Sequence, residues 1–298
     1  MSRVLLFGAS GFIGGHVRAA LAADPRVTAL ICPGRDRYDL IGGDPAGLAA
    51  LLRAESPDAV VSCVGRLTGS DSELIQANTL VATKLIEAVA AAAPAARLVR
   101  LGSAGEYGVV PHGRSVAETD RTAPVAAYGI SHLAATRLFQ LAGESGRADT
   151  AVLRVFNPIG SGLPVANLLG RAAERLRSAL ADGADEITMG PLSAYRDFVD
   201  VRDVASLVLA VVLAPRLRYR IFNAGSGRAV TAREAVALLA DRAGYSGTVR
   251  EEGEGPRRSA AVGWIRADVE LARAELGWSP LHDLAASIKD VWAAGEPG

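Results

Sequence analysis

Short apolar runs alternate with stretches of helical spacing through the first half of the chain. Residues 4–7 are apolar at every position, which is typical of a strand covered on both faces. Strands are predicted at residues 4–7, 27–31, 59–64, 97–101 and 151–156, and helices at residues 16–23, 48–53, 74–93 and 127–142. Strands and helices that alternate in this way form a parallel sheet with helices on both faces. We therefore expect an α/β fold built on a Rossmann-like, doubly wound parallel sheet.

The alternation weakens after Asn157. Helical spacing continues at residues 168–180, 201–213, 234–243 and 269–276, with short strands such as 220–223 between them. This change predicts two units of unequal size. The larger unit is expected to comprise residues 1–157, completed by about 197–224, and a smaller C-terminal α/β unit is expected to comprise residues 158–196 and 225–298.

The composition narrows the class of protein. The 298 residues are 50% hydrophobic, too many for a disordered or collagen-like chain. Lys and Arg (32) balance Asp and Glu (32), so no basic surface for nucleic acid is expected. Two cysteines favour a reducing, cytoplasmic location over a disulfide framework. No targeting segment or membrane span is expected, because a turn signal arrives at Gly8 and no apolar run approaches about 20 residues.

A glycine-rich segment lies between the first strand and the first helix. It consists of Gly8, Ala9, Ser10, Gly11, Phe12, Ile13 and Gly14. A turn without side chains lets the main chain approach a pyrophosphate, and the following helix presents unpaired N–H groups to it. Strand, turn and helix come in the required order, so a dinucleotide is expected here. The larger unit is therefore the expected NAD(P)-binding domain, and the smaller one the expected substrate-binding domain.

The residues after the second strand bear on which dinucleotide binds. An acidic residue at that strand end would bind the ribose 2′-hydroxyl, but the chain carries Arg35 and Arg37 there instead. A guanidinium pairs with a 2′-phosphate through two hydrogen bonds. We therefore predict NADP(H), with NAD(H) as the second choice and two solvated arginines as the alternative interpretation. Further cofactor contacts are assigned to Asp39 and Leu40 near the adenine, and to Cys63, Val64 and Gly65 after the third strand.

A serine, a tyrosine and a histidine are candidates for chemistry. Ser103 ends the fourth strand, at the sheet edge where open α/β sheets bind ligands. Tyr128 and His132 are four residues apart at the start of a helix and so lie on one of its faces. A tyrosine hydroxyl held over a carbonyl can donate a proton during hydride transfer.

Further motifs extend along almost the whole chain. They are the glycine loop, Asn78-Thr79, Ser103, Tyr128 and residues 154–157, 196–204 and 222–227. With these motifs the chain resembles the extended short-chain dehydrogenase/reductases, the family of nucleotide-sugar epimerases, dehydratases and reductases. Within that family it most resembles GDP-4-keto-6-deoxy-mannose reductases, through Gly102-Ser103, Glu106-Tyr107-Gly108 and residues 156–160 and 190–198.

The resemblance implies roles for residues of this sequence. Ser103 would hydrogen-bond the reacting oxygen, and Tyr128 would be the general acid/base. Asn157 and Arg196 would bind the diphosphate of a nucleotide-linked substrate, although a structural ion pair with a neighbouring aspartate is an equal alternative for Arg196. Arg257 or Arg258 would assist near the base and the phosphates.

Two departures from the family's pattern bear on the reaction. His132 stands where the family has a lysine that holds the nicotinamide ribose and, as a cation, lowers the pKa of the tyrosine. A histidine with a pKa of about 6.5 is mostly neutral at pH 7, which favours carbonyl reduction over alcohol oxidation or epimerisation. We expect His132 to orient the ribose. Gly105 stands where the related 4,6-dehydratases have a catalytic glutamate, which argues against dehydration; Glu106 is either structural or substrate-facing.

These features predict an NADPH-dependent ketone reductase with Tyr128 as the proton donor. The favoured substrate is a nucleotide-linked 4-keto-6-deoxy sugar. Three alternatives stay open: a ketoreductase for a non-sugar natural product such as a polyketide, a nucleotide-sugar epimerase, and a non-catalytic NADP-binding protein. The resemblance also implies a homodimer, formed through the helices at residues 74–93 and 127–142. No metal is expected, because no Cys/His/Asp spacing suggests zinc.

Overall fold

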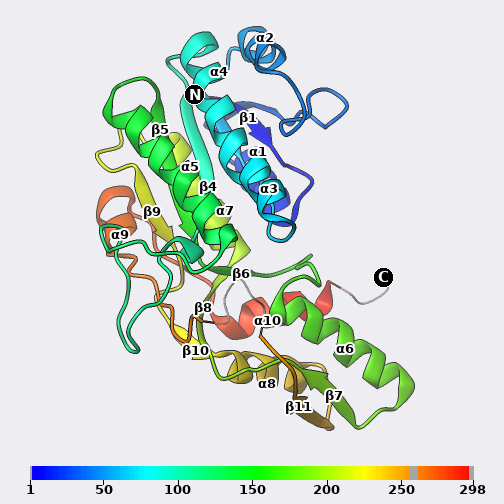
Figure 1. Cartoon of the computed structure of the whole chain (residues 1–298). Helices are drawn as coiled ribbons and strands as arrows, with labels where there is room; N and C mark the ends of the chain where they lie inside the picture. The colour runs from blue at the N-terminus through cyan, green and yellow to red at the C-terminus, as the bar shows by residue number, and fades with distance from the viewer. Residues whose placement is uncertain (1, 256–260, 295–298) are drawn as a thin grey trace.

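A six-stranded parallel sheet forms the centre of the protein. In the computed structural model, which describes residues 2–255 and 261–294, its strands run in the order β2-β1-β3-β4-β5-β9 (Figure 1). They are β1 (Ser2–Phe7), β2 (Val27–Ile31), β3 (Ala59–Ser62), β4 (Arg97–Ser103), β5 (Asp149–Val155) and β9 (Ile221–Ala224). Each pair of neighbouring strands is parallel. The predicted doubly wound α/β fold is confirmed.

Helices cover both faces of this sheet, which explains why most positions in its strands are apolar. In β1, Val4 and Leu6 lie in the core shared with α1 (Phe12–Ala23) and α7 (Val201–Leu213). Leu5 and Phe7 point to the opposite core, which is formed with α2 (Pro45–Glu55), α4 (Val81–Ala92) and α5 (Ala127–Glu144). A strand buried on both sides needs apolar residues at every position, as observed.

The helical region before β4 differs from the single helix predicted at residues 74–93. It consists of α3 (Asp71–Leu74), a π-helical segment η1 (Ile75–Leu80) and α4. The π-helical segment contains Asn78, whose side chain is buried and binds neighbouring elements; such segments are frequent at functional sites. By length and composition, the run Asp71–Ala92 could cross a membrane, but half of its most apolar window is buried inside the protein, as in a core helix.

Two small sheets lie beyond the carboxyl edge of the large one. In the first, β8 (Tyr195–Asp200) pairs with β6 (Asn157–Ile159) in parallel and with β10 (Ala229–Thr231) in antiparallel orientation. In the second, β7 (Glu186–Met189) pairs in parallel with β11 (Thr248–Glu251). Three helices pack around a separate core here, as the lower part of Figure 1 shows: α6 (Leu168–Asp182), α8 (Ala232–Arg242) and α10 (Leu284–Ala293).

The polypeptide returns to the large sheet after β11. The core between the sheet, α1 and α7 includes Ala272, which lies in the short helix α9 (Glu270–Leu276). It also includes Trp264 and Trp278, which lie before and after that helix. Residues 225–298, assigned from the sequence to the smaller unit, therefore contribute to both cores. The boundaries between the two units stay a prediction.

A buried ion pair joins the ends of β4 and β5. Arg154 Nε donates to Glu106 Oε2 at 2.9 Å, and both side chains are almost fully buried. The other carboxylate oxygen accepts the main-chain N–H of Ser103 and the hydroxyl of Thr136, each at 3.0 Å. Arg154 also donates to the hydroxyl of Tyr107 at 3.0 Å. Glu106 lies in the short 3-10 helix η2 (Ala104–Glu106), and these contacts make it a structural residue.

Replacing one partner of this ion pair should be costly. We expect Glu106→Ala to lower the free energy of unfolding by about 3–5 kcal/mol, because the Arg154 charge would stay buried without its partner. The double variant Glu106→Ala/Arg154→Ala should lose less than the sum of the two single variants. Urea unfolding measures both. Glu270→Ala is the control, because the Glu270–Arg273 pair is more than half exposed and should contribute about 0–1 kcal/mol. Equal losses for Glu106→Ala and Glu270→Ala would contradict this account.

Candidate active site

The glycine loop has the geometry that a bound pyrophosphate needs. Gly8 has a φ of +79°, and a Cβ at Gly14 would lie only 1.9 Å from the carbonyl oxygen of Gly8. The helix and the loop can approach this closely only because Gly14 has no side chain. No side chain caps the start of α1 after Gly11, so the N–H groups of its first turn face outward for an anion. The predicted loop residues, including Ser10, Phe12 and Ile13, therefore fit a dinucleotide.

The end of β3 lies against this loop. A Cβ at Gly8 would be 3.0 Å from the carbonyl carbon of Cys63, and one at Gly65 would be 3.2 Å from Asn78 Oδ1. Cys63 and Val64 thus lie beside the glycine loop, and the predicted cofactor contacts of Cys63, Val64 and Gly65 stay predictions. Burial raises the pKa of the Cys63 thiol to about 12, so this cysteine is a neutral wall residue and not a nucleophile.

The two arginines after β2 differ in their surroundings. Arg37 forms an ion pair with Glu55, whereas Arg35 is exposed and forms no hydrogen bond or ion pair with the part of the chain described. Asp39 accepts the N–H of Ile41 at 3.0 Å, and Leu40 is buried in the core beneath α2. Of the four predicted contacts, Arg35 is the most available to a 2′-phosphate.

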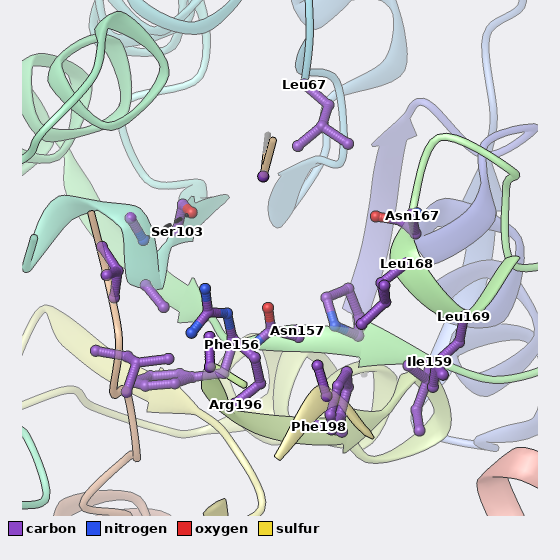
Figure 2. A pocket seen from close by; sticks show the side chains of 18 of the residues that line it. Leu67, Ser103, Phe156, Asn157, Ile159, Asn167, Leu168, Leu169, Arg196 and Phe198 are labelled. Atoms are coloured by element: carbon purple, nitrogen blue, oxygen red, sulfur yellow. Dashed lines mark hydrogen bonds between the residues drawn. The ribbon is translucent and has the colours of Figure 1, made fainter. Parts of the chain in front are cut away.

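A cavity of about 410 Å³ lies between the large sheet and the smaller sheets. Its wall contains Ser103, Tyr128, Asn157 and Arg196, so four of the predicted site residues meet in one place. In Figure 2 the side chains of Asn157 and Arg196 rise from the floor, with Ser103 on one side and Asn167 on the other. The cavity is large enough for a substrate-sized ligand. Arg257 and Arg258 lie outside the described residues.

Ser103 and Tyr128 are held against each other by two glycines. Ser103 Oγ accepts the N–H of Gly105 at 3.0 Å. A Cβ at Gly105 would lie 3.3 Å from Ser103 Oγ and 3.4 Å from a ring carbon of Tyr128. A Cβ at Gly129 would lie 2.4 Å from the carbonyl oxygen of Gly105, so the start of α5 rests directly on this turn. Because residue 105 is a glycine, no side chain lies at this position between Ser103 and Tyr128. The catalytic glutamate of the related dehydratases is therefore missing here.

The floor of the cavity carries a partly buried cation. Arg196 Nη1 donates to the carbonyl oxygen of Tyr195 at 2.8 Å, and burial lowers the pKa of its guanidinium. The neighbouring carboxylate of Asp197 instead accepts the N–H groups of Ser226, Gly227 and Ala267. The ligand-binding role of Arg196 and the alternative ion pair both stay predictions.

His132 lies in α5, and its contact with the nicotinamide ribose stays a prediction. It is buried next to Tyr128, with the two ring centroids 4.7 Å apart, and it does not line the cavity. Burial and the nearby charge of Arg100 hold the pKa of His132 well below its ordinary value of 6.5. The ring is therefore neutral at pH 7, in agreement with the sequence-based expectation that it is a poor cation.

Comparisons with known proteins place this site in a family. Residues 4–225 match the model of the NAD dependent epimerase/dehydratase family. A dTDP-6-deoxy-L-talose 4-dehydrogenase (NAD(P)(+)) of Kitasatospora kifunensis is 40% identical, with 98% of this chain and 95% of that protein covered. The chain belongs to the NAD-dependent epimerase/dehydratase family. It is thus an NAD(P)-dependent enzyme of the extended short-chain dehydrogenase/reductase type, as predicted.

Other relatives share nearly the full length. A GDP-6-deoxy-D-mannose reductase of Pseudomonas aeruginosa is 29% identical, over 97% of this chain and 95% of that protein. The solved structure of RMD from Pseudomonas aeruginosa, complexed with NADPH, superposes with a TM-score of 0.87 at 26% identity. That match covers 99% of this chain and 98% of the other. The relatives of this chain therefore include a GDP-sugar reductase, as the sequence motifs predicted.

Several residues of the site were not found from the sequence. Asn167 and Arg171 line the cavity at the start of α6, where no local pattern marks them, and Ser193 lines it from within the motif at residues 190–198. Arg100 lies beside His132, and a charged residue inside an apolar strand is a signal that could have identified it.

Adding a single methyl group should affect dinucleotide affinity at Gly14 but not at Gly15, the next residue of α1. We expect Gly14→Ala to weaken dinucleotide binding at least tenfold, because the new Cβ would collide with the carbonyl oxygen of Gly8. Gly15→Ala is the matched control, since its Cβ would have 3.9 Å to the nearest atom outside the helix backbone. Fluorescence titration with NADPH measures the affinities, with circular dichroism to confirm folding. Equal affinities for the two folded variants would show that the loop does not hold the dinucleotide.

Proposed function

We propose that this enzyme reduces the 4-keto group of a nucleotide-linked 4-keto-6-deoxyhexose, or oxidises the corresponding alcohol. One observation carries the proposal: Ser103 and Tyr128 share a cavity with Asn157 and the partly buried cation Arg196. Proton-transfer groups and an anion-binding group thus face the same space. A nucleotide-linked sugar combines a reactive carbon with a diphosphate and requires both.

The nucleotide is proposed to be dTDP. The dTDP-6-deoxy-L-talose 4-dehydrogenase is 40% identical to this chain, whereas the GDP-6-deoxy-D-mannose reductase is 29% identical. Both relatives act, by their names, on 6-deoxy sugars. The higher identity favours a dTDP-sugar over the GDP-sugar suggested by the sequence motifs.

The chain's own residues supply the proton and orient the carbonyl group. Bound NAD(P)H provides the hydride for the carbonyl carbon. The phenol of Tyr128 gives its proton to the carbonyl oxygen, which completes the alcohol, and Tyr128 regains a proton from solvent. Ser103 Oγ already accepts the N–H of Gly105, so its hydroxyl proton can donate to the same carbonyl oxygen.

The polar floor of the cavity is proposed to bind the diphosphate. Arg196 offers several N–H donors, and its burial strengthens the attraction to phosphate oxygens. Asn157 Nδ2 donates one hydrogen to the carbonyl oxygen of Asp197 at 2.9 Å, which fixes the side-chain amide. Its second N–H can donate to a phosphate oxygen, and its oxygen can accept a hydroxyl of the sugar. This floor distinguishes a nucleotide-linked substrate from an uncharged natural-product ketone.

The oligomer is proposed to be a homodimer in the cytoplasm. Large apolar side chains are exposed on the two helical regions that the sequence assigns to the interface: Leu80 (56%), Ile130 (51%) and Leu141 (63%). A second copy would cover them.

Removing the phenolic hydroxyl should stop the chemistry without preventing binding. We expect the purified enzyme to oxidise NADPH in the presence of a dTDP-4-keto-6-deoxyhexose, and Tyr128→Phe to lower kcat by roughly 10²–10⁴-fold with little change in KM. Tyr219→Phe is the control, because Tyr219 is 42% exposed and lies outside the cavity. Turnover of non-sugar ketones but not of nucleotide sugars would favour the natural-product alternative. Cofactor binding without turnover of either substrate class would favour a non-catalytic protein.

The exposed arginine after β2 should decide between the two dinucleotides. We expect Arg35→Ala to raise the Kd for NADPH roughly tenfold, because a charged hydrogen bond contributes about 1.5–3 kcal/mol, and to leave the Kd for NADH unchanged. Arg37→Ala should have a smaller effect, since Arg37 is paired with Glu55. Parallel calorimetric titrations give both constants. An equal change for NADPH and NADH would mean that Arg35 does not bind a 2′-phosphate.

A further inference from the structure

Arg100 is a buried cation directly behind the proposed catalytic helix. It lies in the middle of β4, on the sheet face covered by α5, and is 5% exposed. Its guanidinium carbon lies 5.7 Å from the ring centroid of Phe139. Within the described part of the chain, no carboxylate lies within ion-pair distance of Arg100. A buried arginine is usually paired with an acid, so this position calls for an explanation.

The nearest carboxylate reaches Arg100 only through a hydroxyl. Arg100 Nη1 donates to Thr136 Oγ1 at 3.4 Å, and Thr136 donates to Glu106 at 3.0 Å. Glu106 is also bound directly by Arg154, at 2.9 Å. One carboxylate therefore serves two guanidinium groups. Glu118, the next acid, lies beyond Arg154 and binds the N–H of Asn223. Much of the Arg100 charge thus remains unbalanced on the side of α5.

The contact between Arg100 and His132 fixes the position of the imidazole proton. Arg100 Nη2 lies 3.3 Å from His132 Nδ1. A guanidinium has only donors, so Nδ1 must be the acceptor and the ring proton must be on Nε2. A cation at this distance also opposes a second proton on the ring. His132 is therefore a neutral Nε2–H tautomer, held by the arginine beneath it.

The cation nearest to Tyr128 is consequently not at position 132. The rings of Tyr128 and His132 are 4.7 Å apart, and Arg100 contacts Nδ1 of the same imidazole. Burial lowers the pKa of Arg100 to about 10, so the guanidinium stays charged at neutral pH, and its charge interacts with Tyr128. The charged and titratable groups around this pair are Glu106 from η2, Arg154 from β5 and Tyr128 from α5 itself.

We propose that Arg100 is a positioning residue of the active site: it holds His132 as the Nε2–H tautomer and supplies the positive charge that the family's pattern places on a lysine at position 132. This inference rests on the proposed function in one respect, because it takes Tyr128 as the group that transfers the proton. A cation near the phenol stabilises the phenolate, so Tyr128 can also accept a proton from an alcohol. The substitution of lysine by His132 then does not restrict the enzyme to reduction.

The first test needs no substrate. Protein labelled with ¹⁵N in its histidine rings is titrated by NMR between pH 5 and 8, and His132→Gln identifies the signals of His132. In the wild type we expect an unprotonated Nδ1, a protonated Nε2 and no titration over this range. Arg100→Met should mix the two tautomers, because the donor to Nδ1 is lost, whereas burial should still keep the ring from taking up a second proton over this range. A wild-type His132 that titrates normally, or carries its proton on Nδ1, would overturn the inference.

A matched arginine on the same strand controls for a general loss of stability. Arg97 is also buried in β4, but it is paired with Asp149 and does not contact His132. Arg97→Met should leave the NMR signals of His132 unchanged. The conservative variant Arg100→Lys, which keeps the charge, should retain the wild-type titration. If Arg100→Met fails to fold, the wild-type tautomer and Arg100→Lys still decide the question.

The second test uses the pH dependence of kcat in both reaction directions. In Arg100→Met the pKa attributed to Tyr128 should rise by at least one unit, with a tenfold loss of alcohol oxidation at neutral pH and little change in KM. Arg100→Lys should restore most of this loss. The double variant Arg100→Met/His132→Lys should be more active than Arg100→Met, because the lysine then carries the charge; a merely structural arginine would give additive losses.

If the NMR result holds and no substrate is turned over, the proposed function fails and the tautomer assignment stands. Turnover with an unchanged pH profile in Arg100→Met would refute the electrostatic role of Arg100.

Discussion

The carboxylate of Glu106 connects most of the groups on which the active site depends. It accepts hydrogen bonds from Arg154 on β5, from the main chain of Ser103 at the end of β4 and from Thr136 on α5. Three elements that lie far apart in the sequence are thus joined at one buried group. A charge in the interior is stable only when its hydrogen-bonding capacity is filled, so the position of each partner is strongly constrained. Ser103 and α5, which carries Tyr128, are held by that constraint.

The same network explains how a site without the family's lysine can remain charged. Two guanidinium groups and one carboxylate lie beneath α5, and the guanidinium of Arg100 contacts His132. We propose that the positive charge is supplied by the strand below the helix, next to a neutral imidazole that contacts Tyr128. Activity in this family can therefore depend on residues outside the motif that identifies it.

Much of the fold follows from local patterns in the sequence. The strands of the large sheet are mostly apolar, and the helices between them show clear spacing, so their positions were predicted to within a few residues. The glycine loop, Ser103, Tyr128, Asn157 and Arg196 were predicted from motifs, and the structure brings the last four to one cavity. Their roles stay proposals.

Other features could not be predicted because they depend on contacts between distant segments. The π-helical segment around Asn78 is stabilised by bonds to Arg66 and Ser131, which no local pattern reveals. The return of Trp264 and Trp278 to the first core depends on tertiary packing. The partner of His132 lies 32 residues earlier, on a neighbouring strand. Burial, and not sequence spacing, determines the protonation state of that histidine.

The central claim is that Tyr128 and its surroundings direct hydride transfer to carbon 4 of a nucleotide-linked sugar. The most direct measurement uses NADPH that carries deuterium at the transferable position of the nicotinamide, with a dTDP-4-keto-6-deoxyhexose as the acceptor. NMR and mass spectrometry of the product should show one deuterium atom, bound to carbon 4 of the sugar. Oxidised cofactor without deuterium at that carbon, or no cofactor oxidation at all, would contradict the account.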